Sequence, residues 1–164
     1  MKSIVITASG GSLRDMPIKE LSSVTPEIVL NHPTWNMGDK ITVDSATLIN
    51  KVFEVKEAAN LFDIPLEDIE VIFHDESIIH GMANMVDGNS LALLSEPNMR
   101  IPILYALFYP KRVMSKNIKK IDLTKLGKLS FRNRDKKKLN FYNFGIEVIS
   151  CLLYTSPSPR DRPL

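Results

Sequence analysis

Residues 4–12 read Ile4-Val5-Ile6-Thr7-Ala8-Ser9-Gly10-Gly11-Ser12, a short apolar run followed by a glycine pair. A brief run of β-branched residues is typical of a buried strand, and paired glycines after it indicate a turn. Such a turn can bring backbone N–H groups close to a bound anion. A glycine turn after a strand is more often only a turn, so both interpretations stay open.

The residues that follow alternate between helix and loop patterns. Thr25-Pro26 predicts a helix start, with proline at the first helical position, and that helix ends before His32. Residues 32–38 have no period and predict a loop. The clearest helix is expected over about residues 45–62, capped by Asp44 or Ser45. Its apolar side comprises Leu48, Ile49, Val52, Phe53, Val55, Ala59 and Phe62.

The second half of the chain adds strands to this pattern. Residues 69–73 predict a strand, and Asp87-Gly88-Asn89 separates two apolar runs as in a β-hairpin. A short helix is expected from Pro102 to Phe108, whereas residues 139–153 fit a strand or a helix equally well. Because strands and helices interleave around one hairpin, we expect an α/β (mixed α+β) fold with a mixed sheet covered by helices.

Composition limits the class of protein to a globular chain. Of its 164 residues, 44% are hydrophobic and 24% charged, enough for a packed core. No apolar run approaches the roughly 20 residues of a membrane span, and the N-terminus is not that of a signal peptide. Cys151, the single cysteine, allows no internal disulfide, and it cannot build a structural zinc site with three scattered histidines.

Charge is concentrated in one segment. Residues 116–138 contain ten Lys or Arg against two Asp, a balance of +8. A solvated connection is favoured over a nucleic-acid contact, because only Phe131 could stack on bases there. We therefore divide the chain into a domain at 1–115, a basic connecting segment at 116–150 and a tail at 151–164. The proline-broken tail resembles translated adapter sequence, the alternative being a disordered terminus.

Two groups of residues could perform chemistry. Ser45, Asn50 and Lys51 offer donors that suit an anion, and Glu54 lies one helical turn from Asn50, where it could bind a cation. The alternative without a ligand is that Lys51 and Glu54, three residues apart on a helix, form an ordinary surface ion pair. Trp35 and Met37 lie in the 32–38 loop, where covering a ligand competes with an ordinary core role. A lone histidine such as His32 is more often structural.

A series of colinear motifs resembles the 1-deoxy-D-xylulose 5-phosphate reductoisomerase family. It comprises Thr7-Ala8-Ser9-Gly10-Gly11, His32-Pro33-Thr34-Trp35-Asn36-Met37-Gly38, Asp44-Ser45-Ala46-Thr47-Leu48-Ile49-Asn50-Lys51 with Glu54, Ser77-Ile78-Ile79-His80-Gly81-Met82 and Glu96-Pro97-Asn98-Met99-Arg100-Ile101-Pro102. The resemblance covers about residues 2–131 and continues more weakly to Ile149. Several motifs in the expected order are far more specific than one glycine turn.

The resemblance implies a role for each matched position. Ser9, Ser45, Asn50 and Lys51 would bind the substrate phosphate, and Glu54 would be one of three acidic ligands of Mg²⁺ or Mn²⁺. His32, Trp35 and Met37 would form a lid over the substrate. His80 and Ser77 would line the pocket, and Met99 would be a more peripheral wall residue. With His32, Trp35 and Met37, His80 completes the set expected at the catalytic centre.

The family reaction implied is the rearrangement and NADPH-dependent reduction of 1-deoxy-D-xylulose 5-phosphate to 2-C-methyl-D-erythritol 4-phosphate, in isoprenoid precursor biosynthesis. No residue here matches a cofactor-binding position, because no G-x-G-x-x-G motif occurs. We therefore expect a fragment that lacks the N-terminal Rossmann domain and the C-terminal helical domain and is inactive alone. The alternative is a non-catalytic nucleic-acid-binding module that uses residues 116–138.

The chain departs from the family pattern at three motifs. The usual N-K-G-L-E is Asn50-Lys51-Val52-Phe53-Glu54, the usual H-P-Q-S is His74-Asp75-Glu76-Ser77, and Ser12 replaces a proline. Asp75 and Glu76 add negative charge near an expected anion site. The resemblance further implies a sugar phosphate substrate, no membrane and a homodimeric parent. The compartment would be the cytoplasm in a bacterium or a plastid-type organelle in a eukaryote.

Overall fold

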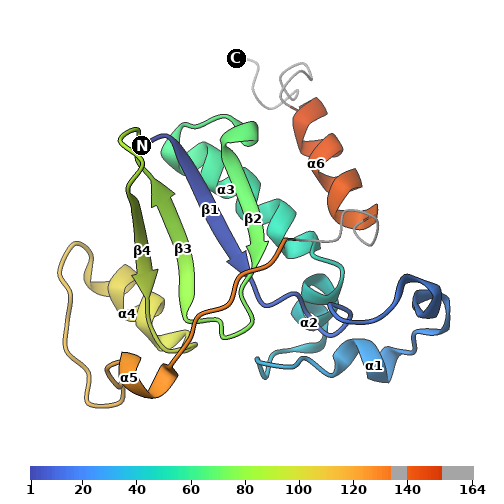
Figure 1. The fold of residues 1–164 in the computed structure, drawn as a ribbon, viewed down its shortest axis with the longest axis horizontal. Coiled ribbons are helices and arrows are strands. Elements are labelled where there is room, and N and C mark those ends of the chain that lie inside the picture. The colour runs from blue at the N-terminus through green and yellow to red at the C-terminus, as the bar shows by residue number, and fades with distance from the viewer. Residues whose placement is uncertain (134–139, 153–164) are drawn as a thin grey trace, which may run out of the picture. The chain divides into compact units, whose positions relative to one another are not determined.

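The computed structural model describes residues 1–133 and 140–152 (Figure 1). Within these residues the chain divides into two compact units. The sheet unit comprises residues 1–10 and 68–133, and the helical unit comprises residues 11–67 and 140–152. Each unit is therefore built from two separate pieces of the chain.

The sheet unit contains a mixed four-stranded sheet in the order β2-β1-β3-β4. The strands are β1 (Ser3–Ala8), β2 (Ile69–Phe73), β3 (Ile79–Asn84) and β4 (Ser90–Leu94). β1 pairs in parallel with β2 and antiparallel with β3, which pairs antiparallel with β4 (Figure 1). Since β1 is a central strand, its residues from Ile4 to Ala8 are buried, as its β-branched run predicts.

The predicted hairpin is confirmed between β3 and β4. Asp87 Oδ1 accepts a hydrogen bond from the Asn89 N–H at 3.0 Å, and Gly88 adopts a φ of 90°, which favours glycine. The register shifts between Ile79 and Gly81, so the irregularity falls at His80. A bulge of this kind re-aims a side chain, and His80 is exposed.

Short elements precede and follow the strands. A 3-10 turn, η2 (Leu66–Asp68), ends the helical piece before β2, and in the sheet unit α4 (Arg100–Phe108) begins two residues before the expected Pro102. α5 (Leu123–Leu126) is capped by Asp122, whose Oδ1 accepts from the N–H groups of Thr124 and Lys125. The chain then returns beside β2, where Arg132 pairs with Phe73.

The helical unit begins with η1 (Ile18–Ser23) and α1 (Pro26–Leu30), and α1 starts at the predicted proline. It continues with α2 (Asp39–Ala46) and α3 (Ile49–Phe62) and ends with α6 (Asn140–Leu152). The segment whose sequence period left strand and helix equally open is thus a helix, and it packs against α3.

The prediction of one helix from Ser45 to Phe62 is wrong in its first turn. α2 ends at Ala46, and Leu48 takes a left-handed φ of 59° before α3 begins at Ile49. A left-handed residue reverses the local backbone turn and so separates two helices. The predicted apolar side is wrong as well for Phe53 and Phe62, which are 62% and 56% exposed, whereas the structure buries Val52, Val55 and Ala58.

A glycine allows α6 to pack closely against α3. A Cβ atom added at Gly145 would lie 2.6 Å from Val52 Cγ2 and 3.3 Å from Ile49 Cδ1. Tyr142 and Ile149, one turn on either side of Gly145, are buried. The spacing of these three residues defines the face of α6 that meets α3.

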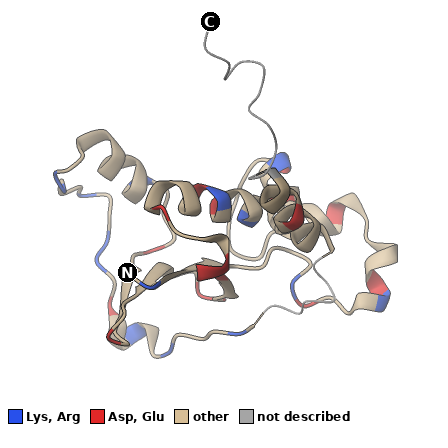
Figure 2. Cartoon of the chain, turned by 90° about the horizontal axis from the view of Figure 1, so that it is seen from above, with Lys and Arg blue, Asp and Glu red and all other residues tan. Residues whose placement is uncertain are grey.

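Lys and Arg positions are distributed over several segments of the cartoon, interspersed with acidic residues (Figure 2). The lysines of the described part of the basic segment, from Lys116 to Lys128, are exposed. The expected tail at 151–164 lies outside the described residues beyond Leu152. No helix among residues 1–133 and 140–152 is long and apolar enough to cross a membrane.

Candidate functional site

The junction between α2 and α3 positions three of the four predicted phosphate ligands. Ser45 lies in the last turn of α2 and is buried, and Asn50 and Lys51 lie in the first turn of α3. The left-handed Leu48 between them is 2% exposed, so packing fixes the angle between the two helices. The first turn of a helix carries partial positive charge, which suits an anion.

Gly11 brings the glycine turn against the end of α2. Its φ is 66°, and a Cβ atom there would lie 2.6 Å from both Ala46 Cα and Ser45 O. These are backbone atoms that cannot move aside, so no larger residue fits without displacing α2. Gly11 therefore sets the position of the helix end that carries Ser45.

His32 connects the loop at 32–38 to Ser45. The N–H groups of Thr34 and Trp35 donate to His32 Nδ1 at 3.1 and 2.9 Å, so Nδ1 carries no proton. Nε2 then carries the proton of the neutral ring and donates to Ser45 Oγ at 3.2 Å. Burial lowers the pKa of His32, and the nearby positive charge of Arg14 lowers it further, which favours this neutral form.

Lys51 and Glu54 are paired with each other. Lys51 Nζ lies 2.8 and 2.7 Å from the two carboxylate oxygens of Glu54. Asn50 Nδ2 reaches the same carboxylate at 3.5 Å, the limit of a hydrogen bond, while Asn50 Oδ1 is buried without a partner. Lys51 and Glu54 are therefore paired as the alternative expects, although the pair is part-buried rather than fully exposed, and an anion would have to draw Lys51 away from Glu54.

The described residues do not form a divalent-cation site. Residues 1–133 and 140–152 contain no group of three or more His, Cys, Asp or Glu side chains that could hold a metal ion. Glu54 is a single carboxylate with a lysine across both of its oxygens. It could be at most one ligand of a site completed by other residues.

The remaining predicted site residues are divided between the two units. Met37, half-buried, follows Trp35 in the loop of the helical unit. Ser9 follows β1 in the sheet unit. His80 is also in the sheet unit, where its Nε2 lies 2.7 Å from Ser95 Oγ. The structure thus brings together His32, Ser45 and the loop, and separately Asn50, Lys51 and Glu54.

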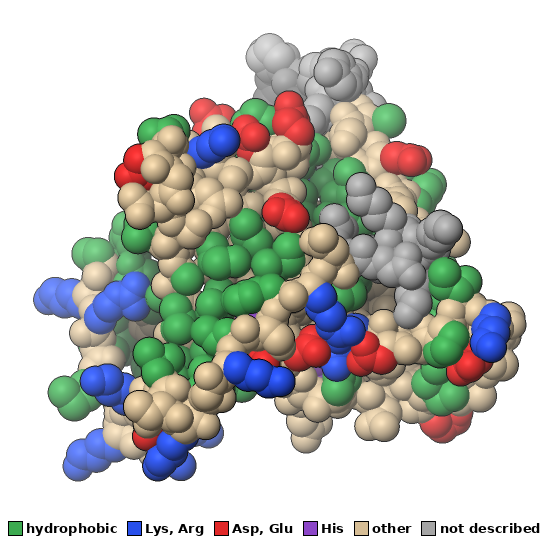
Figure 3. Space-filling view, in the orientation of Figure 1, with side chains coloured by type: hydrophobic (Ala, Val, Ile, Leu, Met, Phe, Trp, Pro, Cys, Tyr) green, Lys and Arg blue, Asp and Glu red, His purple; other side chains and the backbone are tan. Residues whose placement is uncertain are grey.

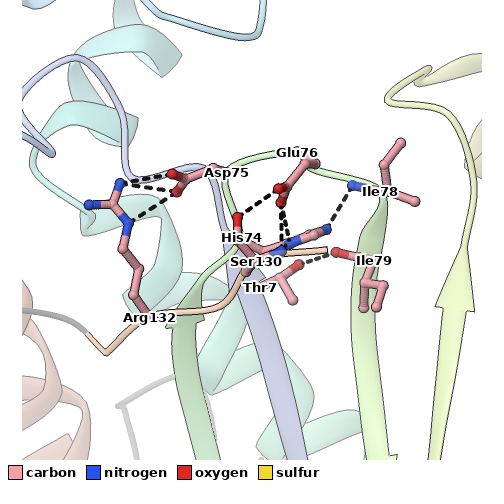
Figure 4. Close-up of polar contacts among 8 residues, drawn as sticks. All are labelled: Thr7, His74, Asp75, Glu76, Ile78, Ile79, Ser130 and Arg132. Carbon is pink, nitrogen blue, oxygen red and sulfur yellow. Dashed lines mark hydrogen bonds and ion pairs between the residues drawn. The ribbon is translucent and has the colours of Figure 1, made fainter. Parts of the chain in front are cut away.

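Two polar residues for which the sequence predicted no site role have defined roles in the structure. Arg14, 15% exposed, adds positive charge beside His32. His74 is completely buried and forms a polar network with Glu76 and Ser130 (Figure 4). A histidine directly after a buried strand was the available signal, but its partner lies 56 residues along the chain.

Sequence comparisons identify the class of protein to which this fold and these residues belong. The profile described as 1-deoxy-D-xylulose 5-phosphate reductoisomerase C-terminal domain matches residues 1–62, and that described as DXP reductoisomerase C-terminal domain matches residues 94–152. The chain is thus of the sugar-phosphate reductoisomerase class, in its C-terminal region.

The curated relatives agree with this class. The chain is 51% identical over 128 residues to 1-deoxy-D-xylulose 5-phosphate reductoisomerase from Thermomicrobium roseum, covering 78% of this chain and 33% of the relative. It is 49% identical over 144 residues to the Bacillus subtilis enzyme of the same name, covering 88% and 38%. The chain belongs to the 1-deoxy-D-xylulose 5-phosphate reductoisomerase family, and it spans about a third of the length of these relatives.

Solved structures show the same fold. A DOX-P reductoisomerase crystallised with NADPH, fosmidomycin and magnesium matches with a TM-score of 0.85 and 39% identity, over 92% of this chain and 36% of that one. The Zymomonas mobilis enzyme in complex with NADPH matches with a TM-score of 0.82 and 40% identity, over 92% and 38%. The predicted family and mixed sheet are therefore confirmed, and nothing in these matches favours the nucleic-acid alternative.

Proposed function

We propose that this chain is the substrate-binding part of a 1-deoxy-D-xylulose 5-phosphate reductoisomerase. The parent enzyme would rearrange and reduce 1-deoxy-D-xylulose 5-phosphate to 2-C-methyl-D-erythritol 4-phosphate. The main observation in support is the hydrogen bond between His32 Nε2 and Ser45 Oγ, because it joins the predicted lid to a predicted phosphate ligand. The family membership of the chain supports the same assignment.

In this proposal the residues of the chain bind and cover the substrate. Ser45, Asn50 and Lys51, together with Ser9, supply hydroxyl, amide and ammonium donors to the phosphate. Lys51 breaks its ion pair with Glu54 and binds the phosphate instead. The Asn50 amide rotates, so that its Nδ2 donor takes the buried position now held by Oδ1. His32 holds Trp35, and with Met37 and His80 these side chains exclude water from the reacting carbons.

Hydride transfer and activation of the substrate carbonyl require NADPH and a divalent metal ion, which these residues do not bind by themselves. NADPH would supply the hydride, and a Mg²⁺ or Mn²⁺ ion would polarise the substrate carbonyl. Glu54 would contribute one carboxylate to that ion once Lys51 has moved. We therefore expect the 164-residue chain to bind substrate without turning it over.

A binding experiment tests this function. We expect Lys51→Gln to weaken binding of 1-deoxy-D-xylulose 5-phosphate to the chain by about 10-fold to 100-fold, the effect of losing one hydrogen bond to a charged group. Lys56→Gln, on the same helix, is the matched control and should leave the affinity within about twofold. Isothermal titration calorimetry measures both.

Equal losses in the two variants would contradict the phosphate role of Lys51. Turnover has its own test, because oxidation of NADPH is followed by absorbance with the purified chain and substrate. We expect no oxidation, and turnover by the chain alone would overturn its assignment as a non-catalytic part.

We further propose that the parent is a homodimer and, as the relatives above are bacterial, that it works in the bacterial cytoplasm. Support for the dimer comes from β4, an edge strand with Leu91 and Leu93 61% and 58% exposed. Figure 3 shows hydrophobic side chains gathered over the sheet on the face in view. An exposed apolar edge is a template for pairing with a second chain.

A further inference from the structure

Ser77 is held in an unusual backbone conformation beside a buried histidine. Its φ is 53°, in the left-handed region, and its N–H donates to His74 O at 3.2 Å. The side chain is 8% exposed, and its Oγ is buried with no hydrogen-bond partner in the structure. A left-handed non-glycine residue costs on the order of 1 kcal/mol, so surrounding contacts must maintain it.

The His74 ring fixes the residue that follows Ser77. The Ile78 N–H donates to His74 Nε2 at 3.1 Å, so Nε2 is the unprotonated nitrogen. Nδ1 carries the proton and donates to Ser130 O at 2.9 Å, while Glu76 Oε2 lies 3.1 Å from the same nitrogen. The ring therefore joins both ends of the 74–78 loop to residue 130 (Figure 4).

Ser130 also closes the other side of the loop. Its N–H and hydroxyl donate to the two oxygens of Glu76 at 3.1 and 2.6 Å. The Phe131 ring stacks on His74 with centroids 4.8 Å apart, and Arg132 pairs with Phe73 through two backbone hydrogen bonds of 2.9 and 3.1 Å. Residues 130–132, which we name the strap, thus bind the loop by side chain, ring and backbone.

A solvent-exposed ion pair also joins the strap to the loop but does not include His74 or Glu76. Arg132 contacts Asp75 through three hydrogen bonds of 3.0 to 3.2 Å (Figure 4). Both side chains are about two-fifths exposed, at 43% and 38%, so solvent screens the pair. Both carboxylates in which this loop departs from the family pattern are thus paired, Asp75 with the Arg132 guanidinium and Glu76 with the N–H and hydroxyl of Ser130.

We propose that His74, Glu76 and Ser130 are positioning residues that hold the Ser77 hydroxyl ready for a ligand oxygen. The assignment rests on the proposed function only in naming that ligand as the sugar phosphate. Ser77 would exchange a hydrogen bond with a hydroxyl or carbonyl oxygen of the sugar, which satisfies its orphaned Oγ. Through the strap, residues more than 50 positions along the chain fix the conformation of Ser77.

Amide hydrogen exchange and NMR of the unliganded chain test the positioning directly. We expect Ser130→Ala and Glu76→Gln to speed exchange of the Ile78 amide about tenfold and to shift the Ser77 resonances. Ser130→Thr keeps the hydroxyl and should restore the wild-type rates. Asp75→Asn is the matched control, because it removes only the screened ion pair, and it should change neither signal. Wild-type imidazole ¹⁵N shifts should report Nδ1 protonated and Nε2 bare.

A second arm uses 1-deoxy-D-xylulose 5-phosphate as the probe. Ser130→Ala and Ser77→Ala should each weaken its binding about tenfold, and the double variant should lose little more than either alone. Unchanged Ile78 exchange, or equal effects of Asp75→Asn and Glu76→Gln, would overturn the strap. A wild-type chain with a protected Ile78 that binds no substrate would instead count against the proposed function.

Discussion

Single hydrogen bonds define the tautomers of two histidines of this chain, His32 and His74. Nδ1 of His32 accepts two backbone N–H groups, whereas Nδ1 of His74 carries the proton and Nε2 accepts. The half-buried ring of His32 and the buried ring of His74 are therefore opposite tautomers of the neutral form. Each ring holds a loop by its unprotonated nitrogen, so protonation of either ring would remove a hydrogen-bond acceptor.

His32 gives the first prediction at the residue scale. Its lowered pKa means that the unfolded chain binds a proton before the folded chain does, so the contribution of His32 to stability is full above about pH 6.5. It is lost as pH falls through the lower folded value, where Nδ1 is protonated and releases Thr34 and Trp35. Trp35 is the single tryptophan, so its fluorescence should shift in that range.

The control for this shift is His32→Gln, which keeps a hydrogen-bonding side chain but does not titrate near neutral pH. Arg14 and Ser45 are among the groups that face His32. A fluorescence shift of equal size and midpoint in His32→Gln would show that another group is responsible.

Motifs in the sequence identify residues but not their partners. The family pattern singled out Lys51 and Glu54 for separate ligands, yet they bind each other when no ligand is present. Their spacing permits both outcomes, since side chains three residues apart on a helix are neighbours. The family motif included His74 but did not give its role, because that role depends on Ser130 and no local pattern relates residues 56 positions apart.

Helices and strands were predicted where periodicity and turn chemistry agreed. β1, β2, the hairpin and the start of α1 follow from short apolar runs and from Asp87-Gly88-Asn89 and Pro26. The boundary between α2 and α3 could not be predicted, because Leu48 has no preference for a left-handed φ. Tertiary packing imposes this conformation on a residue that would otherwise extend the helix.

The contact between α3 and α6 yields a prediction at the scale of elements. Gly145→Ala should raise intrinsic helix propensity by about 1 kcal/mol, but the added methyl would meet the buried Val52 at 2.6 Å. Because a valine methyl cannot swing aside, we expect a net destabilisation of about 1–2 kcal/mol. Urea denaturation followed by circular dichroism measures the free energy of unfolding.

Phe144→Ala provides the control for α6, since Phe144 is 65% exposed and lies next to Gly145 in the sequence. It should change the free energy of unfolding by less than about 0.5 kcal/mol. A stabilised Gly145→Ala variant would mean that α6 does not pack against α3 through this face in solution.

The whole molecule consists of two units whose pieces alternate along the chain. The sheet order could not be predicted from the sequence, because the parallel pairing of β1 with β2 joins residues 65 positions apart, such as Ile4 and Ile69. The antiparallel β3–β4 pair is local and was predicted. Strand pairs that are close in sequence could therefore be predicted, whereas pairs that are far apart in sequence could not.

We expect two copies of the chain to associate through the edge strand β4. If β4 pairs with a second copy, Leu91→Lys should convert a concentration-dependent dimer to a monomer in sedimentation velocity experiments. Val86→Lys adds the same charge in the nearby turn, where the side chain is already 83% exposed, and should leave the dimer intact. A chain that is monomeric at all concentrations would contradict the pairing through β4.

The interleaving of the two units has a consequence for biosynthesis. β1 lies between β2 and β3, so both partners of β1 are available only once the ribosome has released residue 84, and the strap arrives only with residue 130. α3 in turn waits for α6, which ends at Leu152. Early segments must therefore stay available during translation, and a nascent chain of this kind would expose the apolar strand β1 to chaperones until both of its partner strands have emerged.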